Sequence, residues 1–205
     1  MLQWMHRRAL SRRAAGIEEE LRAIEGQAAR AADAAQGRLF NRAGDLCASA
    51  ELPRRAVFYY GRAVDAYLQA GYLGPATAMC RKILRSSPGA VRAHCTLACL
   101  AAHEGHGQAV RSEIRFFVEA SRRTRTERLT IPRLRLVGEA VHDGEVKRYV
   151  AAQLAELGDH LGGERILASL ERGAQRDDDV TPEEQQWQRL VRTAALDPDE
   201  LWKYA

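Results

Sequence analysis

The stretch AVDAYLQAGYLGPATAMCRKILRSSP, residues 63–88, decides the fold, because its pattern of small and apolar residues returns 34 residues later. Its small and apolar positions correspond in turn to Leu97, Ala98, Ala101, Gly105, Val110, Ile114 and Phe117. A glycine therefore recurs where a turn is expected, and packing residues recur where the two helices of a hairpin would touch. We expect a chain built from stacked two-helix repeats, the first of which ends at Pro88.

Composition supports an all-α chain. The 205 residues include 31 Lys+Arg and 27 Asp+Glu, and 46% are hydrophobic, which excludes a wholly disordered chain. Alanine, leucine, arginine and glutamate are strong helix formers, and no alternating apolar and polar run predicts a strand. No uncharged apolar run reaches the roughly 18 residues of a membrane span, so none is expected.

An offset third unit completes the pattern, and it is formed by Ala43-Gly44, Cys47, Ala56, Tyr60 and Ala63. With the two units above, these residues resemble the tetratricopeptide repeat over residues 38–121. The resemblance implies an α-α superhelix with a concave groove, in which proteins of that family grip a segment of another protein.

The chain divides by composition into five segments. We expect a long N-terminal helix over 1–36, repeats over 37–121, an Arg-rich linker over 122–131, a degenerate helical repeat over 132–172 and a C-terminal helical cap over 181–205. The first segment has a stripe from Leu10 to Ala35 with the spacing of a coiled-coil seam. Docking of this stripe on the rest of the chain is expected, with pairing between two chains as the alternative. Trp187, Trp202 and Tyr204 give the cap its aromatic residues.

The resemblance also implies which side chains face the groove. They are Arg38, Asn41, Asp45, Phe58, Asp65, Leu68, Gln69, Arg92, Cys95, Cys99 and His103. Some members of the family hold a C-terminal carboxylate with Lys, Asn and Arg at such positions. Asp65, Cys95 and Cys99 interrupt that set here, so a carboxylate clamp is not expected.

Positive charge gathers in the middle of the chain. A candidate basic patch consists of Arg81, Lys82, Arg85, Arg111, Arg115, Arg122 and Arg123. Such a field favours an acidic protein partner. The alternative is a regulatory module that contacts nucleic acid through residues 81–128. That alternative is less favoured because only Tyr72, Phe116 and Phe117 offer rings for base stacking.

No arrangement of residues predicts catalysis, and no cofactor is expected. Cys95, Cys99 and His103 lie nearly in line on one helix and are candidate metal ligands, but three ligands on one straight helix cannot close a tetrahedral site without a fourth ligand from elsewhere. No metal is therefore expected. Four cysteines without paired motifs are typical of a reducing cytoplasm. The sequence therefore predicts a non-catalytic adaptor, bacterial by its Arg- and Ala-rich composition. We expect it to bind an acidic or amphipathic segment of another protein within an assembly.

Overall fold

A computed structural model describes residues 2–173, with side chains for residues 14–32 and 34–171. Every regular element in this range is a helix and no strand occurs in it, which confirms the all-α prediction. The chain forms two compact units, Met1–Ser86 and Ser87–Ala205. The expected cap over 181–205 lies outside the described residues.

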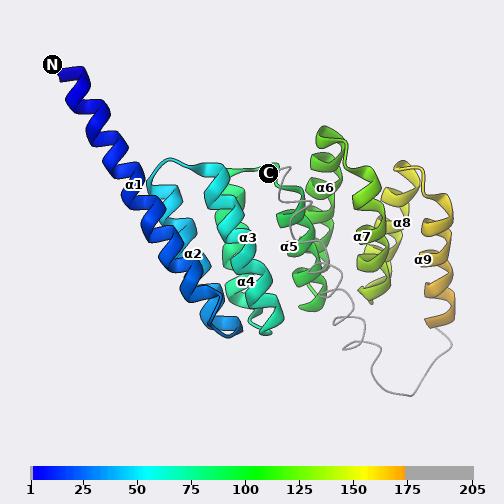
Figure 1. The fold of residues 1–205 in the computed structure, drawn as a ribbon. Coiled ribbons are helices and arrows are strands. Elements are labelled where there is room, and N and C mark those ends of the chain that lie inside the picture. The colour runs from blue at the N-terminus through cyan, green and yellow to red at the C-terminus, as the bar shows by residue number, and fades with distance from the viewer. Residues whose placement is uncertain (1, 174–205) are drawn as a thin grey trace. The chain divides into compact units, whose positions relative to one another are not determined.

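The first unit contains α1 (Leu2–Ala28), α2 (Asp33–Ser49), α3 (Pro53–Gln69) and α4 (Leu73–Ser86). The second contains α5 (Val91–His103), α6 (Gly107–Thr124), α7 (Glu127–Ala140), α8 (Gly144–Glu156) and α9 (His160–Gly173). Within each unit, consecutive helices pack against each other and run in opposite directions (Figure 1). None of these described helices combines the length and the apolar character needed to cross a membrane.

Local sequence signals explain where the helices begin and end. Pro53 is the first residue of α3, where its missing N–H costs nothing. Asp143 caps α8, because its carboxylate accepts hydrogen bonds from the backbone N–H groups of Glu145 and Val146. Gly71 and Gly105 end α3 and α5 in the left-handed region, at φ of 74° and 73°. The turn glycines predicted from the repeat are therefore confirmed.

The 34-residue step of the sequence reappears as hydrogen bonds between helices. Tyr59 on α3 donates to Glu25 on α1 over 2.7 Å. Arg111 on α6 donates to Glu145 on α8 over 2.9 Å, and Arg122 to Glu156 over 3.1 Å. Each pair joins residues 34 positions apart, so equivalent positions of helices two apart in order face each other.

Two glycines allow α3 to lie directly on the backbone of α2. A Cβ atom at Gly44 would lie 2.4 Å from ring carbons of Tyr60, and one at Gly37 would lie 2.7 Å from the ring of Tyr67. Both tyrosines are buried. The rings occupy the space that a larger residue on α2 would fill, which is why a small residue is required at each position.

The core of the second unit is continuous from α5 to α9. It includes Ala98 on α5, Phe117 on α6, Leu134 on α7, Leu154 on α8 and Ile166 on α9, all of them buried. Apolar residues of the degenerate repeat expected over 132–172, such as Leu134 and Leu154, therefore pack in the core of this unit.

Three expected boundaries were wrong. The N-terminal helix ends at Ala28 rather than near residue 36, and α2 begins at Asp33. The expected linker over 122–131 is helical apart from Arg125 and Thr126. The range 37–121, expected as one set of repeats, contains the boundary between the two units.

The linker prediction failed because polar residues there are buried in pairs. Thr130 donates to the Ser121 hydroxyl over 2.7 Å, and both residues are completely buried. Hydrogen bonds of this kind allow a polar stretch to pack inside a core. Pro132 lies inside α7 instead of starting a helix.

We predict opposite effects for the same substitution at two helix glycines. Gly44→Ala should destabilise the protein by about 1–3 kcal/mol, because the Tyr60 ring cannot move away while its hydroxyl is held by Asp45. Gly26→Ala should stabilise it by about 1 kcal/mol, because no atom lies within 4 Å of the added methyl group. Urea unfolding followed by circular dichroism measures both. A stabilising Gly44→Ala would contradict the packing of α3 on α2.

Candidate partner-binding site

The expected groove residues of the first unit do not share one surface. Arg38 and Gln69 are exposed, Asn41 and Asp65 are half-buried, and Leu68 is buried. Asp45 lies on the side of α2 that faces Tyr60, and their side chains form a hydrogen bond of 2.7 Å. Phe58 precedes Tyr60 by two residues and therefore projects from the other side of α3.

Asn41 and Asp45 are joined to α4 rather than open to a ligand. The ammonium group of Lys82 donates to Asn41 over 2.7 Å and to Asp45 over 2.6 Å. Lys82 also lies 5.1 Å from the centroid of the Tyr60 ring. This cluster links α2, α3 and α4 and accounts for one member of the expected basic patch.

Phe58 contributes an exposed aromatic surface on α3. It is 41% exposed, and the guanidinium of Arg62 lies 5.9 Å from its centroid. The same guanidinium lies 4.0 Å over the ring of Phe40 on α2. Arg62 therefore covers the apolar junction of α2 and α3 by cation–π contact.

In the second unit, three of the four expected groove residues on α5 are buried. Arg92, Cys95 and Cys99 are only 2%, 4% and 6% exposed, and the two cysteines belong to the apolar core. Of the four predicted residues on α5, only His103 is exposed. The assignment assumed one apolar face, whereas residues 91–101 contain a single charge and are buried on every side.

The candidate metal ligands do not form a metal site. Cys95 and Cys99 are buried as packing residues, and the pKa of Cys95 is lowered by its hydrogen bond with Cys99 and by Arg133 and Arg92. Among the residues with described side chains, no three His, Cys, Asp or Glu groups come together to hold an ion.

The seven residues of the expected basic patch belong to both units. Lys82, Arg111 and Arg122 are joined to Asp45, Glu145 and Glu156. Arg115 lies 5.0 Å from the centroid of the neighbouring Phe116 ring. Arg81, Arg85 and Arg123 are exposed. Part of the positive charge is thus neutralised within the chain.

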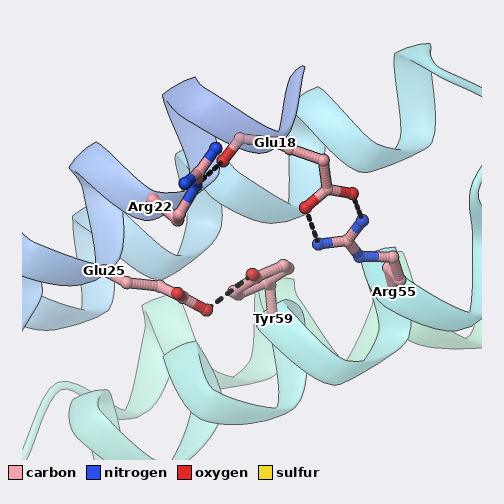
Figure 2. A network of polar contacts seen from close by, with 5 residues as sticks. All are labelled: Glu18, Arg22, Glu25, Arg55 and Tyr59. Carbon is pink, nitrogen blue, oxygen red and sulfur yellow. Dashed lines mark hydrogen bonds and ion pairs between the residues drawn. The ribbon is translucent and has the colours of Figure 1, made fainter. Parts of the chain in front are cut away.

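A different site emerges where α1 docks on α2 and α3. Glu18 on α1 pairs with the guanidinium of Arg55 on α3 through both carboxylate oxygens, and Glu25 accepts a hydrogen bond from Tyr59 (Figure 2). One turn beyond Glu18, Arg22 donates to its backbone carbonyl over 3.2 Å. Glu20 pairs with Arg42 on α2 over 2.8 Å. Three carboxylates of α1 therefore bind three groups of the α2–α3 hairpin.

These contacts shift the pKa values of Glu18 and Tyr59. The pKa of Glu18 is lowered, chiefly by its hydrogen bond to Arg55. Burial and the hydrogen bond to Glu25 raise the pKa of Tyr59 to about 12. Tyr59 is therefore a neutral donor at physiological pH, and Glu18 is an anion.

Charge on the two sides of this contact is complementary. Residues 14–28 contain four Glu and one Arg, and three of these carboxylates face Arg42, Arg55 and Tyr59. The hairpin as a whole, residues 33–69, carries five Arg against four Asp or Glu, so the complementarity lies in these local pairs. In addition, α3 begins without a side-chain cap and without an acidic residue in its first turn. Glu18 supplies a negative group beside that turn, where the helix dipole favours one.

The apolar part of the contact is small. Leu21, Ile24 and Ala28 are buried, whereas Ala14 is exposed and Ile17 is half-buried. Full burial of a leucine or isoleucine contributes roughly 2 kcal/mol, so this part of α1 is held mainly by two large side chains. The 27 residues of α1 span about 40 Å against about 25 Å for the 17 of α2, and α1 extends past the end of α2 (Figure 1).

A cleft opens at the edge of this contact. It has a volume of about 390 Å³ and is lined by Ala14, Ile17, Glu18, Ser49, Ala50, Glu51, Leu52 and Arg55. Glu51 lies in the turn between α2 and α3 at a φ of 60°, in the left-handed region that normally favours glycine. The cleft combines an apolar wall with charged groups, and it leads onto the surface that α1 covers.

None of the four residues at this contact, Glu18, Glu25, Arg55 and Tyr59, was predicted from the sequence. The repeat was recognised only from residue 38 onward, and the N-terminal helix was expected as a separate stripe. Glu25 and Tyr59 are 34 positions apart, so extending the same step toward the N-terminus would have connected α1 to α3.

No protein-family model, curated protein or solved structure matches this chain.

We predict that α1 loosens in acid. Because the folded-state pKa of Glu18 lies below its ordinary value of 4.5, the ion pair with Arg55 is fully formed above that pH and is lost as the pH falls through the lowered pKa. NMR titration of the Glu18 carboxyl carbon, with exchange of the α1 amides corrected for intrinsic rates, measures this. In Arg55→Met, the Glu18 pKa should return toward 4.5. A wild-type Glu18 that titrates at or above 4.5 would disprove the pairing.

Proposed function

We propose that this protein is a non-catalytic scaffold of the tetratricopeptide-like kind, which binds an acidic amphipathic segment of another protein within a cytoplasmic assembly. The observation that carries the proposal is the docking of α1. The acidic second half of α1, with its apolar stripe, lies on the α2–α3 hairpin and pairs with Arg42, Arg55 and Tyr59, so this hairpin has the chemistry to receive such a segment.

The arrangement of helices supports the same conclusion. In a stack of hairpins each helix contacts its neighbours, and side chains on the outer faces remain available for a ligand. The exposed Phe58 and the charged cleft beside Arg55 lie on the same unit as the docked helix. All four cysteines are buried and none forms a disulfide, which is typical of a reducing compartment.

A tagged pull-down from native lysate, with and without nuclease, tests the proposal. We expect one or a few stoichiometric proteins to survive nuclease treatment. The variant Arg42→Glu/Arg55→Glu should lose them, because both arginines face carboxylates on this surface. Loss of every partner after nuclease treatment would instead favour a nucleic-acid contact through residues 81–128.

The matched control reverses two arginines of α6 in the other unit. Arg111→Glu/Arg115→Glu changes the net charge by the same amount but leaves the α2–α3 hairpin untouched. This variant should retain the protein partner. If it loses the partner as readily as Arg42→Glu/Arg55→Glu, the general charge of the chain is responsible and the assignment to α2 and α3 is wrong.

A further inference from the structure

We propose that the second half of α1 occupies the partner's own binding surface, so that a partner helix binds by displacing α1 and carries the same pattern of side chains. This inference rests on the proposed function, because it names the chemistry of the ligand at the α2–α3 hairpin. The pattern is apolar at the positions of Ile17, Leu21, Ile24 and Ala28, and acidic at those of Glu18, Glu20 and Glu25.

The first argument is that α1 meets the hairpin as a ligand helix would. Its apolar residues follow steps of four, three and four, which place one stripe against α2. The carboxylates lie beside that stripe and reach Arg55, Tyr59 and Arg42. A helix of another protein with this pattern would find the same apolar strip and the same donors.

The second argument is that the contact is easily exchanged. Both ion pairs are exposed, since the Glu18 and Arg55 side chains are 49% and 39% exposed and those of Glu20 and Arg42 are 44% and 62% exposed. Pairs in this setting contribute little to stability because water and salt screen them. Few buried side chains remain to hold α1 in place.

The third argument comes from two glycines inside α1. Gly16 and Gly26 have φ angles that any residue adopts, and a Cβ atom on either would meet nothing within 4 Å. Packing therefore gives no reason for glycine, in contrast to Gly44 beneath Tyr60. Glycine in a helix interior weakens the helix relative to alanine. Gly16 directly precedes the docked turns and Gly26 lies within the last of them, so both make these turns easier to unwind.

The cleft between α1 and the α2–α3 turn provides the point of entry. Its lining includes Ile17 and Glu18 from α1 and Leu52 and Arg55 from the hairpin. An incoming helix that places an apolar side chain against Leu52 and a carboxylate beside Arg55 would compete directly with Ile17 and Glu18. Displacement can then proceed along α1 toward Leu21 and Ile24.

The test uses a fluorescent peptide of residues 14–30 of this chain, added to the full-length protein, with binding followed by anisotropy. In the chain Glu18→Lys/Glu25→Lys, the resident α1 should dock poorly, and the peptide should bind about tenfold more tightly than to the wild type. In the chain Gly16→Ala/Gly26→Ala, α1 should dock more firmly, and the peptide should bind about tenfold more weakly.

Gly74→Ala on α4 is the control for a glycine substitution outside α1, because apart from its neighbour Pro75 its added methyl group meets nothing within 4 Å. It should leave peptide binding unchanged. Equal binding of the peptide to the wild type and to both α1 variants would overturn the inference. So would weaker binding to Glu18→Lys/Glu25→Lys, which is checked for folding by its circular dichroism spectrum.

The same variants separate this inference from the proposed function. In the pull-down, Gly16→Ala/Gly26→Ala should capture less partner than the wild type. If Gly16→Ala/Gly26→Ala captures as much partner as the wild type while Arg42→Glu/Arg55→Glu captures none, the scaffold function stands and the displacement of α1 is refuted. If the wild type captures no protein partner, the proposed function fails, whatever the peptide does.

Discussion

The first unit depends on the close approach of α3 to α2, which two small residues make possible. The rings of Tyr60 and Tyr67 rest on the backbone of α2 at Gly44 and Gly37, and no larger residue could occupy those two positions without moving the rings. This contact fixes the distance between the two helices and sets the direction in which Arg55 and Tyr59 project. The docking of α1, the Lys82 cluster and the cleft all use side chains whose positions follow from it.

Polar groups distinguish the two sides of this hairpin. On one side, the ammonium group of Lys82 on α4 donates hydrogen bonds to Asn41 and Asp45 and pairs with the charge of Asp45. On the other side, Arg55 and Tyr59 are matched only by carboxylates that belong to α1. The first arrangement joins α2 to α4 and uses Lys82 for both of its acceptors. In the second arrangement, a carboxylate of another protein could replace Glu18 or Glu25 opposite Arg55 and Tyr59.

The helical repeat was predictable from sequence because it depends on local and periodic signals. The turn glycines at 71 and 105 lie one 34-residue step apart, and the small residue beneath Tyr60 belongs to the offset unit that the same pattern predicts. The proline that starts α3 is a local signal of its own. Which side chains lie on the surface, and which of them pair across helices, was less predictable. Groove positions on α5 were assigned as though one face were open, but this helix is surrounded by core residues. The Glu18–Arg55 pair joins residues 37 positions apart on helices that are not consecutive, and only their packing brings the two side chains together.

The division of the chain into two contiguous units has a consequence for its synthesis. All residues of the first unit leave the ribosome before any residue of the second, so the α2–α3 hairpin can form while α5 is still being translated. The acidic second half of α1, residues 14–28, emerges even earlier, yet the groups that hold it, Arg55 and Tyr59, follow about 30 to 40 residues later. For that interval the nascent chain carries an acidic segment whose partners Arg55 and Tyr59 have not yet been synthesised.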